Sequence, residues 1–205
     1  MTPRFPTTLL AGALLMLSGC QASGPAPAAP PLERTGLVTM RARPVTLVGH
    51  GVAVGDLAPG FTAVGIDLGE RALAEFRGRT VILTTVPSLD TTVCDLQTRN
   101  FNEKAGALSR GVVVVTVSMD LPFAQKRWCG LHDAPNVVTL SDSKRREVGE
   151  RYGLLMKENG LLARAVLVID PAGVVRYQQI VPEVASEPDY DLALAAAKSA
   201  GQGGE

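Results

Sequence analysis

The residues that could carry chemistry gather around one thiol, Cys94, at the end of the stretch VPSLDTTVC. An apolar, β-branched run ends at Val86, a loop led by Pro87 follows, and Cys94 sits where a helix is expected to begin. A helix N-terminus carries unpaired N–H groups and a partial positive charge, which favour a thiolate. Thr91 could donate its hydroxyl to the sulfur if the loop wraps around the first turn. The pattern predicts a nucleophilic cysteine, with a buried, inert cysteine as the alternative.

The neighbours of the cysteines exclude one class of redox chemistry. Residues 94–97 read Cys-Asp-Leu-Gln and residues 129–132 read Cys-Gly-Leu-His, so neither contains a Cys-x-x-Cys pair. Dithiol reductases and copper chaperones of the thioredoxin-like type need that pair. A zinc site using Cys129 and His132 is disfavoured because further ligands at zinc spacing are missing. We therefore expect a first step that uses one cysteine, with no metal and no cofactor.

The elements that must position this thiol follow an α/β pattern. The runs 80–86 and 112–118 are apolar and β-branched throughout, as expected of central strands covered on both faces. Residues 94–110 between them show one apolar helical face. The order strand, helix, strand, helix, closing with a hairpin and a helix, predicts helices on both faces of a sheet. A thioredoxin-like mixed sheet with an N-terminal β-hairpin fits this order, and periodicity alone also permits a flavodoxin-like sheet.

Shorter elements complete the expected domain. Each is bounded by turn residues such as Gly, Pro or Asp. They are a hairpin within 37–49, a strand near 61–66, a helix at 121–130, a strand at 136–140, a helix at 143–153, a hairpin at 164–181, and a final helix introduced by a capping box of Ser186 and Asp189.

The composition indicates one well-cored globular domain. The chain has 205 residues, of which 46% are apolar, and its 20 Lys and Arg balance its 20 Asp and Glu. No basic cluster alternates with aromatic residues, so a nucleic-acid partner is not expected.

The N-terminal residues indicate export. Arg4 is the only charge before the apolar run LLAGALLMLSG, a layout typical of a secretory signal. The run is too short for a comfortable membrane span, which needs about 20 apolar residues. Residues 17–20, Leu-Ser-Gly-Cys, resemble the lipobox of bacterial lipoproteins, which implies cleavage before Cys20 and a diacylglycerol on its sulfur. An ordinary signal peptide, with Cys20 incidental, is the alternative.

The next segment is expected to be a tether. Residues 20–36 are rich in Pro, Ala and Gly and poor in large apolar side chains, so they cannot bury enough surface to fold. The expected organisation is a signal peptide at 1–19, a lipidated tether at 20–36 and a folded domain at 37–205. This predicts an extracytoplasmic protein, in the periplasm or cell envelope, anchored to a membrane through its lipid.

A resemblance to a known family sharpens these hypotheses. The spacing Pro87-x-x-x-Thr91-x-x-Cys94 resembles the peroxiredoxin signature, which marks only the superfamily. From about residue 38 onward the chain resembles the thiol peroxidase subfamily, the atypical two-cysteine peroxiredoxins. The runs that carry this resemblance are VPSLDTTVCDLQTRNFN, VSMDLPFAQKRWCG, NVVTLSD, LLARAVLVID and VPEVASEPDYDLAL.

The resemblance implies a thioredoxin-fold homodimer that reduces hydrogen peroxide and organic or lipid hydroperoxides. Cys94 would be the peroxidatic nucleophile and Cys129 the resolving thiol, joined in an intramolecular disulfide. Thr91 would hydrogen-bond the thiolate and the bound peroxide, and Pro87 would shield the pocket from water. Arg164 would bring its guanidinium beside the nucleophile. The electron donor would be thioredoxin or, outside the cytoplasm, a thioredoxin-like reductant.

Three of these residues could instead have purely structural roles. Arg164 could form a surface ion pair, Thr91 could serve only as a helix cap, and Cys129 could be a structural thiol. A disulfide needs Cα atoms within about 7 Å. We expect the reduced thiols to lie farther apart, so that the first turn after Thr91 and residues 127–130 unfold locally. A non-enzymatic redox sensor or partner-binding lipoprotein is the alternative function.

Overall fold

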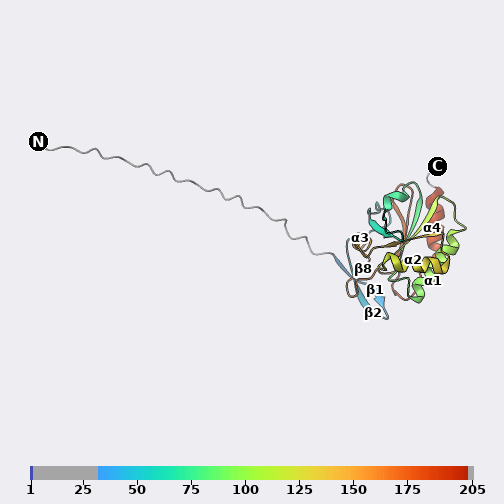
Figure 1. Ribbon diagram of the computed structural model, residues 1–205, viewed down its shortest axis with the longest axis horizontal. Helices are drawn as coiled ribbons and strands as arrows, with labels where there is room; N and C mark the ends of the chain where they lie inside the picture. The colour runs from blue at the N-terminus through green and yellow to red at the C-terminus, as the bar shows by residue number, and fades with distance from the viewer. Residues whose placement is uncertain (2–31, 203–205) are drawn as a thin grey trace. The chain divides into compact units, whose positions relative to one another are not determined.

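Two β-sheets and the helices that flank them order the part of the chain that the structure, a computed structural model, describes: Met1 and residues 32–202 (Figure 1). The elements in chain order are β1 (Glu33–Met40), β2 (Arg43–Val48), β3 (Thr62–Gly65), β4 (Glu70–Ala72), the 3₁₀ helix η1 (Leu73–Phe76), β5 (Thr80–Thr85), α1 (Thr92–Ala105), β6 (Val112–Ser118), α2 (Pro122–His132), β7 (Val137–Ser141), α3 (Glu147–Arg151), β8 (Leu155–Met156), β9 (Ala165–Ile169), β10 (Val175–Ile180) and α4 (Tyr190–Gln202).

The larger sheet is mixed and has β6 at its centre, next to β5. Its strand order is β10-β9-β5-β6-β7-β3-β4, and the smaller sheet has the order β1-β2-β8. Strands β5, β6 and β7 run parallel, whereas β9 is antiparallel to β5 on the other side. All six residues of β5 are buried, which explains its β-branched sequence. The antiparallel strands exclude the flavodoxin-like alternative, and the predicted thioredoxin-like sheet is confirmed.

Both faces of the large sheet are covered, as predicted. On one face, Ile82 and Val166 of the strands pack against Phe101 of α1 and Ala193 of α4. The other face is covered by α3 and the loops around it, and a fully buried aliphatic side chain there contributes about 1.5–3 kcal/mol. Side chains that meet on this second face are Leu83, Val115, Leu167, Val148 and Tyr152.

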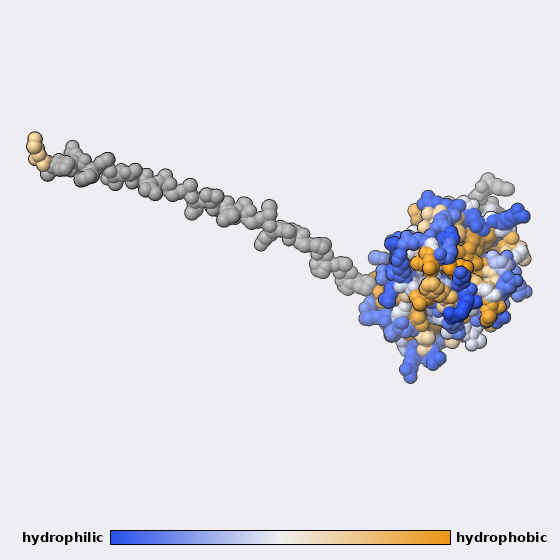
Figure 2. Space-filling view, viewed as in Figure 1, coloured by the Kyte–Doolittle hydropathy of each residue, from blue (hydrophilic) through white to orange (hydrophobic). Residues whose placement is uncertain are grey.

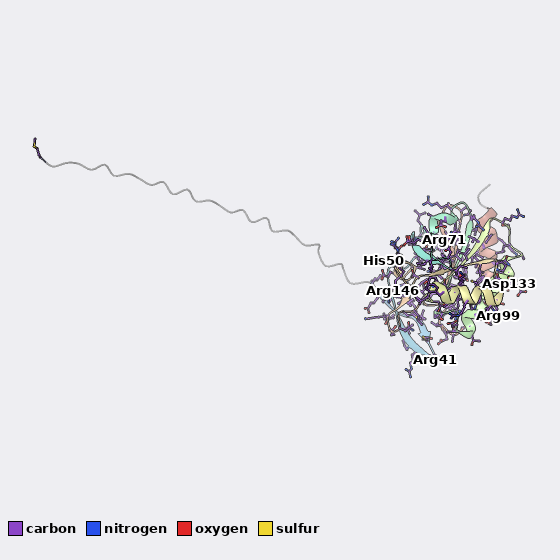
Figure 3. The ribbon with its side chains drawn as sticks, viewed as in Figure 1. Arg41, His50, Arg71, Arg99, Asp133 and Arg146 are labelled. Carbon is purple, nitrogen blue, oxygen red and sulfur yellow. The ribbon has the colours of Figure 1, made fainter. Side chains whose placement is uncertain are left out.

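The turn of the β1–β2 hairpin is held by one carboxylate, that of Glu183, in addition to the pairing of β2 with β8. Arg41 and Ala42 form its turn with φ of 53° and 61°, the left-handed pair that a two-residue hairpin turn requires (Figure 3). Glu183 accepts hydrogen bonds from both of their N–H groups, at 3.1 and 3.0 Å, and from the Thr39 hydroxyl at 2.8 Å. These bonds hold non-glycine residues in a conformation that they seldom adopt.

Three predicted boundaries are wrong. Strand β1 begins at Glu33, so residues 33–36 belong to the folded domain rather than to the tether. Helix α1 begins at Thr92 and ends at Ala105, short of the expected residue 110, although the chain beyond it still packs on the same apolar cluster. Helix α3 has five residues instead of eleven because Arg146 before it has φ of 58°, which α-helical backbone does not allow.

The expected capping box of the last helix is also wrong. Asp189 itself caps α4, since its Oδ1 accepts from the N–H of Leu192 at 2.9 Å, whereas the N–H of Ser186 bonds to the carbonyl of Glu183 in a turn. Apart from Met1, the expected signal peptide and Cys20 lie outside the described residues. Within the described part of the chain, no helix combines the length and the apolar character needed to cross a bilayer.

Candidate active site

The active-site loop, residues 86–91, follows the carboxyl end of β5 and is hydrogen-bonded to β6 and to the residues just after it. The N–H of Val86 bonds to the carbonyl of Val117 at 3.0 Å. The Asp120 carboxylate accepts from the Ser88 hydroxyl and from the N–H of Leu89, each at 2.7 Å. Sequence reasoning missed this aspartate, although an acidic residue two positions after a buried strand lies at the sheet edge where ligands bind. It fixes the path of the chain into α1.

Helix α1 begins as the sequence predicts, with Thr91 as its N-cap residue. The N–H of Asp95 bonds to the carbonyl of Thr91 at 2.9 Å, so the N–H groups of residues 92–94 point out of the helix end. Cys94 is the third residue of the helix and lies in that first turn. Its sulfur is therefore close to the positive end of the helix dipole.

Arg164 is buried beside the Cys94 sulfur. Its Nη2 lies 3.2 Å from Sγ, its Nη1 donates to Gln97 Oε1 at 2.5 Å, and its Nε donates to the Val184 carbonyl at 2.9 Å. The residue is 1% exposed and Cys94 is 0% exposed. The structure thus brings together two residues that are 70 positions apart in the sequence, and the surface ion pair considered for Arg164 is excluded.

The three hydrogen-bond partners of this guanidinium are an amide oxygen, a backbone carbonyl and the thiol. None of the three is a carboxylate that could balance its charge. A buried cation without a counter-charge is costly. An ionised Cys94 would supply the missing negative charge through a charge-assisted contact. The geometry thus places a cation in direct contact with the sulfur that the sequence predicts to be the nucleophile.

Gln97 is a site residue that sequence reasoning missed. It is fully buried, and its Nε2 donates to the Thr84 hydroxyl at 3.0 Å while its Oε1 accepts from Arg164. The amide thereby orients the guanidinium toward Cys94. The signal was its spacing: a residue three positions after the thiol lies on the same helix face.

The two remaining residues of the signature have different surroundings. Pro87 is buried, in keeping with its expected shielding of the site. Thr91 is exposed, and its hydroxyl donates to the Ser88 carbonyl at 3.0 Å. Among the described residues it makes no hydrogen bond to Cys94. For Thr91 to donate to the thiolate or to a peroxide, its hydroxyl must turn away from Ser88.

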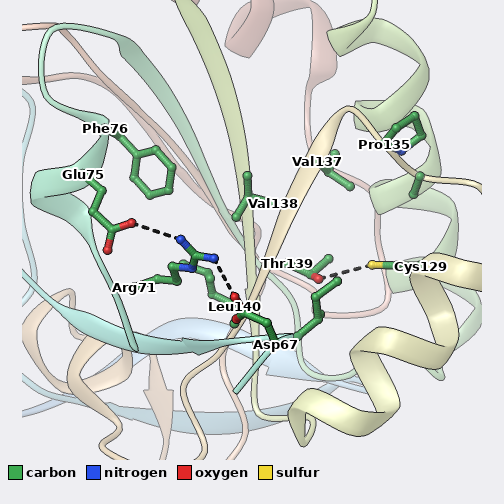
Figure 4. Close-up of a pocket in the computed structure, with 13 residues that line it drawn as sticks. Asp67, Arg71, Glu75, Phe76, Cys129, Pro135, Val137, Val138, Thr139 and Leu140 are labelled. Carbon is green, nitrogen blue, oxygen red and sulfur yellow. Dashed lines mark hydrogen bonds and ion pairs between the residues drawn. The ribbon is translucent and has the colours of Figure 1, made fainter. Parts of the chain in front are cut away.

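Cys129 lies on α2 and is half-buried, with its thiol free, as is that of Cys94. Its Sγ is 3.3 Å from the Thr139 hydroxyl of β7. It opens onto a cavity of about 570 Å³. Figure 4 shows the sulfur directed at Thr139, with Arg71 and its partner Glu75 on the opposite side of the cavity. Cys129, which the resemblance predicts to be the resolving thiol, thus contacts an uncharged side chain, the hydroxyl of Thr139.

A second cavity, of about 410 Å³, lies between the active-site loop and α2. Leu89, Thr91 and Asp95 line it on one side and Trp128 and His132 on the other. Figure 2 shows apolar surface exposed on the face on which Figure 1 draws α2. Cys94 is not among the residues that line this cavity, and its side chain is fully buried. The sequence did not indicate this burial.

A thioredoxin-like sheet that holds a cysteine in the first turn of a helix, against a buried arginine, defines a thiol-based redox enzyme. The family model described as Redoxin matches residues 53–194. The thiol peroxidase of Listeria monocytogenes serotype 4b (strain F2365) is 50% identical over 163 residues, which cover 80% of this chain and 98% of that protein. The thiol peroxidase of Bacillus subtilis (strain 168) is 48% identical over 162 residues, 79% of this chain and 96% of that protein.

A solved structure agrees. The crystal structure of a peroxiredoxin-like protein from Aquifex aeolicus matches with a TM-score of 0.76 at 42% identity, over 84% of this chain and 99% of that one. The chain belongs to the thiol peroxidases of the peroxiredoxin family. It is a peroxidase that uses thiol chemistry to reduce peroxides, and the sensor alternative gives way to an enzyme.

Proposed function

We propose that the catalytic cycle starts when the Cys94 thiolate attacks one oxygen of a hydroperoxide. The S–O bond forms as the O–O bond breaks, the sulfur becomes a sulfenic acid, and the leaving alkoxide or hydroxide takes up a proton to give an alcohol or water. Negative charge develops on the oxygens, so fixed donors accelerate the step. Arg164 and the N–H groups of the first turn are suited to this role, and Thr91 would join them after its hydroxyl turns.

The observation that carries this proposal is the guanidinium of Arg164, 3.2 Å from Cys94 Sγ in a fully buried setting. Arginine keeps its charge at any working pH, and its planar fork can serve three partners at once. A thiol with only a packing role would gain nothing from a neighbouring buried cation.

Resolution would follow through Cys129. Its thiol condenses with the sulfenic acid, which forms the intramolecular disulfide and releases water. Each sulfur has to leave its present partner, Arg164 in one case and Thr139 in the other. We therefore expect the first turn of α1 and residues 127–130 of α2 to unfold locally during this step.

Reduction of the disulfide closes the cycle. A dithiol reductant transfers two electrons by thiol–disulfide exchange, which frees both cysteines and leaves the reductant as a disulfide. The family relationship supports thioredoxin or a thioredoxin-like protein in this role. We expect hydrogen peroxide and organic or lipid hydroperoxides as substrates, with the organic group in the cavity bounded by Leu89 and Trp128.

The location and assembly proposed for the enzyme rest on the sequence alone. The leader and Cys20 support a lipid-anchored protein of the periplasm or cell envelope, which would require an exported reductant. The homodimer is expected from the family resemblance. Intact mass of the native protein tests the anchor, because a diacylglycerol on Cys20 adds the mass of its acyl chains, and sedimentation of the domain tests the dimer.

The chemistry is tested by peroxide consumption with cumene hydroperoxide and a thioredoxin system. Cys94→Ser should abolish turnover, with a loss of more than about 10³-fold, since no other group can act as nucleophile. Cys129→Ser is the matched control, which should still consume one equivalent of peroxide per chain and then stop. If Cys94→Ser keeps wild-type turnover, the proposed mechanism is wrong.

A further inference from the structure

The neighbours of the two cysteines are bonded to each other. Asp95 directly follows Cys94, and Trp128 directly precedes Cys129. The Asp95 Oδ1 accepts from Trp128 Nε1 at 3.0 Å and lies 3.2 Å from Nε2 of His132. One carboxylate oxygen at the start of α1 thus contacts two side chains of α2.

The other oxygen of the same carboxylate stays within α1. Asp95 Oδ2 accepts from Nε of Arg99 at 3.0 Å and lies 2.9 Å from its Nη2. The indole of Trp128 is 6% exposed, and its ring centroid lies 4.7 Å from that of His132. The contact to α2 is therefore partly shielded from water, whereas Arg99 projects from the exposed side of α1 (Figure 3).

Helix geometry makes this contact incompatible with the disulfide. Consecutive side chains on an α-helix point about 100° apart, because 3.6 residues make one turn. While Asp95 and Trp128 face each other, the adjacent cysteines face other partners, Arg164 and Thr139. Joining the two sulfurs requires at least one helix to unwind or rotate at these positions, and either movement pulls Asp95 away from Trp128.

We propose that Asp95, Trp128 and His132 form a latch that holds the first turn of α1 against α2 in the reduced enzyme, and that Asp95 is its positioning residue. The latch keeps Cys94 beside Arg164 for attack on peroxide. After oxidation it has to open before Cys129 can reach the sulfenic acid. This inference rests on the proposed two-cysteine cycle.

The latch also sets how long the sulfenic acid is exposed to a second peroxide. A second hydroperoxide oxidises it to sulfinic acid, with one oxygen transferred to sulfur and an alcohol or water released. Disulfide formation and this over-oxidation compete for the same intermediate. A weaker latch should therefore speed the first reaction and lower the yield of the second.

The test follows one turnover of the reduced full chain after a pulse of cumene hydroperoxide. Quenched samples analysed by intact mass separate the disulfide, which has lost two hydrogens, from the sulfinic acid, which has gained two oxygens. Asp95→Asn removes the charge, and Trp128→Phe removes the N–H while keeping an aromatic ring. Arg99→Gln is the matched control, because it removes the partner of the same carboxylate that does not reach α2.

Both latch variants should form the disulfide about 3- to 10-fold faster than wild type, the range expected for the net loss of one partly solvent-screened hydrogen bond. Their sulfinic acid yield at high peroxide should fall by a similar factor, with Arg99→Gln within about twofold of wild type on both counts. For Asp95→Asn, Trp128 fluorescence gives the same rate independently.

Two outcomes overturn the inference, and they differ. The rate of disulfide formation is counted from the loss of the Cys94 thiol, so a changed rate of attack on peroxide does not enter it. If the disulfide then forms no faster in Asp95→Asn and Trp128→Phe than in Arg99→Gln, there is no latch although the cycle stands. If the wild type forms no oxidised Cys94 at all, the proposed cycle has failed, and the latch falls with it.

Discussion

The two thiols of the domain, Cys94 and Cys129, are the same residue type in opposite settings. Cys94 is fully buried at the start of α1, with the Arg164 guanidinium 3.2 Å from its sulfur. Cys129 lies within α2, is half-buried beside an open cavity, and has the neutral hydroxyl of Thr139 at 3.3 Å. The first setting supplies a positive charge and a helix terminus, and the second supplies neither.

This difference supports the two roles proposed for the cysteines. A thiolate is the nucleophile, so we expect the sulfur beside a cation to attack peroxide first. A resolving thiol needs mobility and access more than charge, and a weak neutral contact leaves it both. Because Cys94 is fully buried, we expect side chains around it to move before a peroxide can reach its sulfur.

The largest effect should come from removing the charge that distinguishes the two settings. Arg164→Gln keeps a hydrogen-bonding side chain but no cation, and the rate of the reduced enzyme with peroxide should fall about 10²- to 10³-fold. Stopped-flow fluorescence of Trp128 measures this rate. Arg164→Lys should restore only part of it, because an ammonium group cannot bond Gln97, Val184 and the sulfur together. A rate within twofold of wild type in Arg164→Gln would mean that the charge of Arg164 does not make Cys94 more reactive.

A stability measurement tests the same comparison without peroxide. Cys94→Ser leaves the buried Arg164 beside a neutral hydroxyl, and we expect it to lower the free energy of unfolding by about 1–3 kcal/mol. Cys129→Ser removes a thiol with no charged partner and should cost less than about 1 kcal/mol. Urea unfolding of both reduced variants at neutral pH gives the two values. Equal losses would mean that Cys94 carries no compensating charge.

A smaller effect is expected at the neutral contact. Thr139→Val keeps the β-branched shape of a buried strand residue but removes the hydroxyl next to Cys129. The freed thiol should form the disulfide about 2- to 3-fold faster, since a thiol makes only a weak hydrogen bond. Quenched-flow mass analysis of the oxidised chain measures this rate. A slower disulfide would show that Thr139 orients Cys129 for resolution rather than holding it back.

The sequence was sufficient for the features that depend on local pattern or family resemblance. The buried run of β5 predicted the central strand, and the position of Cys94 after a proline-led loop predicted its place in a first turn. Arg164 came from the resemblance, because nothing local in the sequence relates it to a cysteine 70 residues away.

The features that the sequence did not yield depend on side chains from separate elements. The amide of Gln97 and the carboxylate of Asp120 look like ordinary polar residues until the fold brings their partners to them. The burial of Cys94 depends on an apolar cluster drawn from several elements, which includes Val86, Trp128 and Val166. The predicted helix boundary was wrong where a single backbone angle decides it, as the positive φ of Arg146 does for the start of α3. Hydrophobic periodicity carries no information about such an angle.

The smallest predicted effect concerns the remote support of the Cys94 site. Backbone N–H groups, that of Ala42 foremost and then that of Ala185, lower the pKa of the Glu183 carboxyl from 4.5 to about 2. A carboxyl whose pKa is lower in the folded state stabilises the fold above pH 4.5, and this contribution is lost as the pH falls toward 2. The next residue, Val184, holds Arg164 through its carbonyl. Protonation of Glu183 should therefore loosen both the hairpin and the support of the guanidinium.

Glu183→Gln isolates this contribution because it is neutral at every pH. We expect it to be less stable than wild type by about 1 kcal/mol at neutral pH, a value reduced by solvent screening of this partly exposed group, and equally stable near pH 2. Burial raises the pKa of Asp142 from 3.8 to about 6, which lowers stability as the pH rises through that range, but both proteins share this group. The difference between their urea midpoints across pH therefore reports Glu183 alone. A difference that stays constant down to pH 2 would mean that the carboxylate charge does not hold the hairpin.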